Sequence, residues 1–291
     1  MSIARQTFSY FLNVYYIMSE INIFASVKNP KSNSGNLGDL FGYKLMEYLC
    51  KPLNIKVNRI GINDKIVNNT FSLVGSICHL CNQKAKENKK IIIIGCGIII
   101  ENGTKWNNKY IEWKGIRGPS TLKLINKNCP VISDPGLLIS KIFPIKRKPT
   151  KKIGYIIHSV DRETFFKFFP EKKQYLINNY TTYEEFTNQL SEYDSVISSS
   201  LHGIIFCHAY SIPVASIKVT DKIIGGDFKY IDYYHSINYT KFKGRHRINK
   251  NTDFLDLIKN EWQPSKEKIH YFQNLQEKII ISNIKNIIQN Q

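Results

Sequence analysis

The chain has 291 residues, of which 42% are hydrophobic and 22% are charged. These values are ordinary for a soluble globular protein, they exclude a chain that is disordered over most of its length, and the length allows two domains. The formal net charge of +18 predicts attraction to polyanions without choosing among lipid headgroups, phosphorylated substrates and nucleic acid, although a Lys-, Asn- and Ile-rich composition also raises charge without any functional meaning.

The N-terminal segment allows two interpretations. Phe8–Met18 is apolar and aromatic, but only Arg5 precedes it and no small-residue cleavage site follows, so it makes a poor signal peptide. Residues 1–17 are either untranslated, with Met18 as the true start, or a short interfacial anchor. No segment reaches the ~18–20 apolar residues that a bilayer span requires. We expect a cytoplasmic protein, with peripheral attachment to the inner face of a membrane as an extension of that view.

The next segments alternate strand-like and helix-like patterns. The run Ile91–Ile94 is continuously apolar, which is typical of a buried parallel strand, and Pro119 suits the first position of a helix. The elements expected up to residue 133 are a strand Ile21–Val27, a helix Asp39–Cys50, strands Ile91–Ile94 and Glu112–Arg117, a helix Pro119–Asn126, and a strand Val131–Ser133.

A basic stretch with Pro144 and Pro149 then separates this half from a second one. The elements expected there are strands Ile153–Ile157, Ser195–Ser198 and Val214–Val219, helices Thr182–Ser191 and Leu201–Tyr210, and a long tail helix Pro264–Ile288. Strands that alternate with helices predict an α/β fold with parallel sheets. We expect two Rossmann-like domains that face a central cleft: residues 19–140, a linker 141–152, residues 153–263, and a C-terminal helix 264–291.

Six cysteines are dispersed along the chain, and no export signal accompanies them, so we interpret them as reduced thiols. They are Cys50, Cys78, Cys81, Cys96, Cys129 and Cys207. Cys78 and Cys81 form a C-x-x-C without a second pair at zinc-finger spacing, so a structural zinc site is not expected. No other cluster of metal ligands stands out in the sequence.

Polar residues follow several strands, at positions that should point into the cleft, because ligands of open α/β sheets bind beyond the carboxyl ends of the strands. The first such segment is Ser34–Asp39, in which glycines permit close approach of a ligand and Asn36, Gly38 and Asp39 precede or open a helix. Asp39 is either a helix cap or a catalytic or substrate-binding carboxylate.

Three further segments carry ionisable side chains. Arg117 ends a strand and faces a helix start, so its guanidinium either grips a carboxylate or phosphate or belongs to a structural salt bridge. Asp134 lies in Ser133-Asp134-Pro135-Gly136, which a turn alone explains. His158 follows a strand and precedes Asp161, and it is either a site residue or a surface histidine.

The segment Ser198–Gly203 is the most informative, because three hydroxyls and a histidine fall at the end of a strand and the start of a helix. Hydroxyls, free backbone N–H groups and the positive end of the helix suit an oxyanion. The same surroundings lower the pKa of His202 and favour the neutral imidazole at pH 7. The alternative is a capping serine beside a packed histidine.

Taken together, these motifs resemble the polysaccharide pyruvyl transferase family, over about residues 21–239. The matching segments, in order, are Asn36–Asp39, Gly95-Cys96-Gly97, Ile116–Pro119, Ser133–Gly136, Ile157-His158, Ser198–Gly203 and Phe228–Tyr234. Cys96 stands where relatives usually show Ser or Thr. The resemblance implies two facing Rossmann-like domains (the GT-B arrangement), phosphoenolpyruvate as donor, and a pyruvate ketal on a sugar of a surface polysaccharide or of a lipid-linked precursor.

Carried over by motif, the resemblance assigns His202, Asp39 and Arg117 as catalytic residues. The donor phosphate would be bound by Arg117, Ser199, Ser200, Leu201, His202 and Gly203. Further residues expected at the cleft are Asn36, Gly38, Gly97, Asp134, His158 and Lys229. The chemistry fits these groups, because a donor with a phosphate and a carboxylate needs cationic and N–H ligands. The reaction requires no redox cofactor, and we expect no metal site, because the sequence offers no clear cluster of metal ligands.

Two other functions stay open. A glycosyltransferase that uses a nucleotide sugar could have the same fold, and Arg117 and His202 could serve its diphosphate. A non-enzymatic module that binds polyanions or membranes is suggested by the basic cluster Lys241, Lys243, Arg245, His246, Arg247 and Lys250. No nucleic-acid motif accompanies that charge, so we expect no nucleic-acid partner, whereas peripheral contact with an anionic membrane is compatible with the enzyme.

Overall fold

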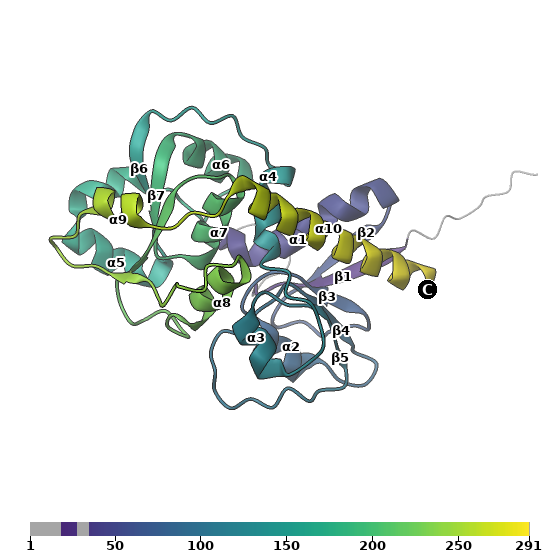
Figure 1. The fold of residues 1–291 in the computed structure, drawn as a ribbon. Coiled ribbons are helices and arrows are strands. Elements are labelled where there is room, and N and C mark those ends of the chain that lie inside the picture. Colours follow the sequence, from purple (N-terminus) through teal and green to yellow (C-terminus); the bar gives the residue numbers. More distant parts are fainter. Residues whose placement is uncertain (1–18, 28–34, 291) are drawn as a thin grey trace, which may run out of the picture.

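Two parallel sheets organise the protein (Figure 1), whose computed structural model describes residues 19–27 and 35–290. The strand order is β2-β1-β3-β4-β5 in the first sheet and β6-β7-β8-β9 in the second. The strands are β1 (Glu20–Phe24), β2 (Lys56–Ile60), β3 (Thr70–Ser72), β4 (Ile91–Ile94), β5 (Ile111–Gly115), β6 (Lys151–Ile156), β7 (Tyr193–Ser198), β8 (Val214–Lys218) and β9 (His246–Arg247). The expectations for residues 1–17 lie outside the described residues.

Helices lie in all connections between the described strands except β2–β3 and β4–β5, as is usual for parallel pairing. They are α1 (Leu37–Cys50), α2 (Cys78–Lys84), α3 (Pro119–Ile125), α4 (Ile139–Ile142), α5 (Ser159–Phe168), α6 (Tyr183–Ser191), α7 (Leu201–Ala209), α8 (Phe228–Ser236), α9 (Phe254–Asn260) and α10 (Lys266–Gln289). Three short 3-10 segments are η1 (Lys51–Leu53), η2 (Pro135–Leu138) and η3 (Pro170–Tyr175). The expected α/β class with parallel sheets is confirmed.

Several expected bounds differ from the structure. The expected strands Ile21–Val27 and Glu112–Arg117 are β1 (Glu20–Phe24) and β5 (Ile111–Gly115). The expected strand Val131–Ser133 forms only a single bridge, between Ile116 and Val131, so the first sheet ends at β5. The segment 141–152 is not wholly a linker, because α4 includes its first two residues and β6 its last two. β6 starts early because the Lys151 N–H donates to the Glu192 carbonyl at 3.0 Å, which extends the pairing toward β7.

One apolar core joins both sheets. It includes Ile21 and Ile23 of β1 together with side chains of α6 and α7. The ring of Phe41 on α1 lies 5.6 Å from that of Phe206 on α7 and 5.9 Å from that of Tyr183 on α6, measured between centroids. α7 is apolar on almost every side because it is packed between the two halves, which fixes the position of its first turn.

The C-terminal helix α10 leaves the second half and runs across the first (Figure 1). Gln276 Nε2 donates to the Ile132 carbonyl at 2.9 Å, and Gln273 Nε2 donates to the Leu137 carbonyl at 2.8 Å. Ile280 and Ile284 are fully buried on the same face. α10 therefore belongs to the core of the first half. Among the residues that the structure describes, no helix is long and apolar enough to cross a membrane.

Candidate active site

The start of α1 lies where strand order reverses in the first sheet. β1 pairs with β2 on one side and with β3 on the other, and the chain passes from the carboxyl end of β1 into α1. In doubly wound sheets this reversal leaves a crevice in which ligands bind. Asn36 caps α1 there, with its Oδ1 accepting from the Gly38 N–H at 3.1 Å. Ser34 lies outside the described residues.

The first turns of α1 and α7 touch each other directly. A Cβ built on Gly38 would lie 2.0 Å from Nδ1 of His202 and 2.2 Å from its Cγ, far inside a normal contact. Only glycine leaves room there for the imidazole. The hydroxyl of Tyr183 also donates to the Leu37 carbonyl at 2.8 Å. The structure thus brings Asn36–Asp39 and Ser198–Gly203 together, although more than 150 positions of sequence separate them.

The three serines before α7 build the loop with their own hydroxyls. Ser198 Oγ donates to the Ile156 carbonyl at 2.9 Å, Ser199 Oγ accepts from the His158 N–H at 3.0 Å, and Ser200 caps α7. The capping alternative is therefore correct for Ser200. The N–H groups of Leu201 and His202 open the helix, and the first N–H groups of a helix have no intrahelical acceptor. The N–H groups of Leu201 and His202 therefore remain suited to binding an anion.

Arg117 is fully buried and engaged in a network of contacts. Its Nε donates to Asp232 Oδ2 at 3.1 Å, its Nη1 to Ser76 Oγ at 2.7 Å, and its Nη2 to the Ile98 carbonyl at 3.1 Å. A Cβ on Gly97 would lie 2.3 Å from Arg117 Cζ, so that glycine makes room for the guanidinium. The salt-bridge alternative thus describes the contacts of Arg117.

Asp232 on α8 also holds α3. Its carboxylate accepts from the Thr121 N–H at 2.8 Å and from the Thr121 hydroxyl at 2.7 Å. Asp134 Oδ2 lies 3.9 Å from Arg117 Nη1, and Asp134 Oδ1 accepts from the Gly136 N–H at 2.9 Å, as expected for a turn. Burial raises the pKa of Asp134 to about 6, against the opposing effect of the Arg117 charge.

The remaining ionisable groups influence one another through their charges. Burial, then the charges of Arg117, Lys229 and His158, lower the pKa of His202 to about 3, so its imidazole is neutral at pH 7. Burial raises the pKa of Asp39 to about 6, although the Lys229 charge opposes this. Burial and two nearby guanidinium groups lower the pKa of Lys229 to about 8, and burial also lowers that of His158. Asp39, His158, His202 and Lys229 therefore form one cluster.

Sequence reasoning missed several residues around this cluster. Tyr230 donates from its hydroxyl to the Ser199 carbonyl at 2.7 Å, and Asp161 is a buried carboxylate whose charge acts on Lys229. Arg245 is buried as well, whereas the sequence placed it in a basic surface cluster. Asp232 and Tyr230 lie in the segment Phe228–Tyr234, which was noted only for its family resemblance. Arg245 had no local signal.

Two buried thiols contact the hydroxyl of Ser72. Cys96 Sγ is 3.1 Å from Ser72 Oγ, and Cys81 Sγ donates to the same oxygen at 3.4 Å. Burial raises the pKa of Cys81 to about 12, so it stays a thiol. Within residues 19–27 and 35–290, no three His, Cys, Asp or Glu side chains gather so as to hold a metal ion.

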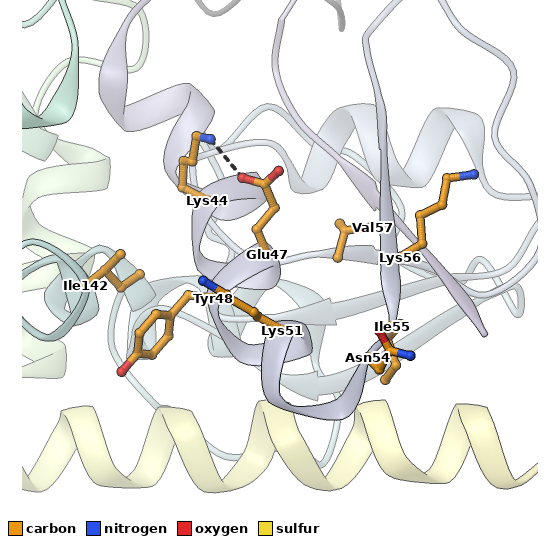
Figure 2. Close-up of a pocket in the computed structure, with 9 residues that line it drawn as sticks. All are labelled: Lys44, Glu47, Tyr48, Lys51, Asn54, Ile55, Lys56, Val57 and Ile142. Carbon is orange, nitrogen blue, oxygen red and sulfur yellow. Dashed lines mark hydrogen bonds and ion pairs between the residues drawn. The ribbon is translucent and has the colours of Figure 1, made fainter. Parts of the chain in front are cut away.

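A hollow of about 600 Å³ lies apart from the cluster (Figure 2). Lys44, Glu47 and Tyr48 on α1 line it, with Lys56 on β2, and Lys44 pairs with Glu47 at 2.8 Å. α10 passes beside this hollow in the same view. None of the expected site residues lines it, so it is not part of the candidate site.

The chain is similar to two uncharacterized proteins and matches one family model. The chain is 28% identical over 210 residues to the uncharacterized protein L143 of Acanthamoeba polyphaga mimivirus, an alignment that covers 68% of this chain and 69% of that one. A solved structure of an uncharacterized Klebsiella pneumoniae protein matches with a TM-score of 0.45 and 17% identity, over 79% of this chain and 93% of that one. The family model for polysaccharide pyruvyl transferase matches residues 36–222, a range that includes both touching turns. The chain thus belongs to the polysaccharide pyruvyl transferase family and is a transferase.

Proposed function

We propose that this transferase moves the pyruvyl group of phosphoenolpyruvate onto two hydroxyls of one sugar, in a surface polysaccharide or its lipid-linked precursor, and so forms a ketal. The observation that carries the proposal is the contact of Gly38 with His202. It joins the start of α1, with Asp39, to the start of α7, where N–H groups and Lys229 offer sites for an anion. Family membership supports pyruvyl transfer as the reaction.

The donor would lie at the start of α7. Its phosphate accepts from the N–H groups of Leu201 and His202, favoured by the positive end of the helix dipole. Lys229, which is only partly buried, adds a positive charge for the anionic donor as a whole. Arg117 is enclosed by protein ligands, so it positions α8 through Asp232 and contributes its charge as the phosphate leaves.

The reaction would proceed in steps that balance. A proton is added to the methylene carbon of the enol, and an acceptor hydroxyl attacks the adjacent carbon and loses its own proton. The bond from that carbon to the phosphate oxygen then breaks, and a neighbouring hydroxyl of the same sugar closes the ketal and loses its proton. One net proton leaves with phosphate. A general acid or base contributes ~10²–10⁴-fold to such steps.

Asp39 and Lys229 suit these proton transfers. The pKa of Asp39 is raised to about 6 and that of Lys229 is lowered to about 8, so both lie near neutral pH, where acid–base catalysis is most effective. In this proposal Asp39 accepts the proton of the acceptor hydroxyl. His202 is neutral before the donor binds, and a bound phosphate would raise its pKa and let it carry a proton.

The proposed arrangement of substrates follows the two sheets. Residues 19–140 would form an acceptor domain and residues 153–263 a donor domain, facing each other as in the GT-B arrangement. The first turns of α1, which follows β1, and of α7, which follows β7, support this proposal, because they are in contact at Gly38 and His202.

The test is to incubate purified protein with phosphoenolpyruvate and candidate glycans. Phosphate release and an acid-labile ketal should appear together. His202→Ala should abolish both, while His270→Ala, which removes an exposed histidine of α10, should abolish neither. A melting temperature that rises with sugar nucleotides, but not with phosphoenolpyruvate, would instead identify a nucleotide-sugar glycosyltransferase.

A further inference from the structure

Arg245 has a buried donor that no described residue accepts from. Its side chain is fully buried, its Nε donates to Asp227 Oδ1 at 2.5 Å, and its Nη2 donates to the Gly226 carbonyl at 3.3 Å. The guanidinium also stacks on the ring of Tyr230, with its Cζ 4.1 Å from the ring centroid. Among residues 19–27 and 35–290, its Nη1 finds no hydrogen-bond partner. A buried unsatisfied donor on a charged group is costly, which indicates a missing acceptor.

The contacts of Arg245 determine which way that donor faces. Asp227 and Gly226 occupy the edge of the guanidinium that carries Nε and Nη2, so Nη1 lies on the other side. Tyr230, on which the guanidinium stacks, donates from its hydroxyl to the Ser199 carbonyl at 2.7 Å. Arg245 is thereby held beside the loop that leads into α7.

Two guanidinium charges act on Lys229, and one of them, that of Arg245, is itself paired with Asp227. The Arg245 charge lowers the pKa of Lys229 and of His158, and the Arg117 charge lowers that of Lys229 as well. The opposing groups are Asp39 and Asp161, and Asp161 Oδ1 already accepts from the Thr220 hydroxyl at 2.5 Å. The mutual repulsion of these positive charges is a cost that a bound anion would offset.

We propose that Arg245, together with Lys229, forms a second anion subsite, which binds the carboxylate of the donor while the start of α7 binds its phosphate. This inference rests on the proposed function. Arg117 cannot supply the subsite in this arrangement, because its Nε, Nη1 and Nη2 already donate to protein acceptors. The subsite selects a donor that carries two separate anionic groups.

Calorimetric titration with two probes tests this subsite. Phosphoenolpyruvate carries both groups, and inorganic phosphate carries one. Arg245→Gln should weaken phosphoenolpyruvate binding by about 10- to 100-fold, the effect of one charge-assisted hydrogen bond, and phosphate binding by less than about threefold. Lys243→Gln removes the same charge two residues away at an exposed position, and it should change neither affinity.

A second variant covers the case in which Arg245→Gln fails to fold. Arg245→Lys keeps the charge but lacks the planar fork, and it should weaken phosphoenolpyruvate binding about tenfold, again without a matching loss for phosphate. Unchanged affinity for phosphoenolpyruvate in the variant that folds, or equal losses for both probes, would overturn the subsite alone. No binding of phosphoenolpyruvate by the wild-type protein would overturn the proposed function and the subsite together.

Discussion

Replacing Gly38 by Ala should displace the histidine at the centre of the candidate site. The new Cβ would lie 2.0 Å from Nδ1, 2.2 Å from Cγ and 2.6 Å from Cβ of His202. Apolar contacts are optimal at about 3.5–4.0 Å, so the ring must retreat by about 1.5 Å or the two helices must separate. Either movement alters the site without removing any catalytic group.

The size of the effect follows from this displacement. Misplacing a catalytic group by about 1 Å can cost on the order of 100-fold in rate, so we expect Gly38→Ala to lower kcat at least that much. Overpacking should cost about 1–3 kcal/mol of stability, partly offset by the better helix propensity of alanine, at most about 1 kcal/mol.

Gly42, one turn along the same helix, provides a matched control. A Cβ at Gly42 would meet its nearest neighbours, Val74 Cβ and the Val74 nitrogen, at 3.6 Å, which is an ordinary contact. Gly42→Ala should therefore retain activity and keep or raise the melting temperature. The measurements are phosphate release from phosphoenolpyruvate with an acceptor glycan, and thermal unfolding of both variants. Equal activity and equal melting temperatures for the two variants would refute the contact between Gly38 and His202.

Three other changes test the surroundings of the site. Asp232→Asn should cost about 3–5 kcal/mol in urea unfolding, because it leaves the buried Arg117 charge without its anionic partner; a loss below 1 kcal/mol would show that this ion pair is not needed. Asp39→Asn should abolish activity yet stabilise the fold above pH 6 by up to about 3 kcal/mol, because the raised pKa means that the folded state disfavours the ionised carboxyl. This gain in the free energy of unfolding should vanish as the pH falls through 6 toward 4. A difference between variant and wild type that stays constant with pH would contradict it. Ile280→Ala should lower the free energy of unfolding by about 2–5 kcal/mol, whereas Lys285→Ala, at an exposed position, should change it hardly at all. Similar losses for both variants would show that α10 is not packed in the core.

Several features could be predicted from the sequence because their signals are local. The apolar run Ile91–Ile94 forms β4, and Pro119 opens α3, at the expected residues. Thr182 caps the next predicted helix, with its hydroxyl accepting from the Glu185 N–H at 3.1 Å. A few consecutive residues determine burial on both faces of a strand, or the geometry of a cap, whatever the rest of the chain does.

The order of the motifs also indicated which helix N-termini lie at the same site. Asp39 and His202 were expected at one site, and the structure places their helices in contact through Gly38. The weaker predictions concerned what each polar group binds. The hydroxyl of Ser200 caps its own helix, and Arg117 is held by protein acceptors, which the sequence allowed only as alternatives.

The sequence by itself determined the α/β class, the starts of α3 and α7, and the family, since each depends on residue types at short spacing. Only the tertiary structure decided that Arg117 pairs with Asp232, 115 positions away, and that Arg245 is buried beside Tyr230 instead of exposed with its basic neighbours. The physical reason is that burial and ion pairing belong to pairs of groups, and the partner of each of these cations comes from another part of the chain.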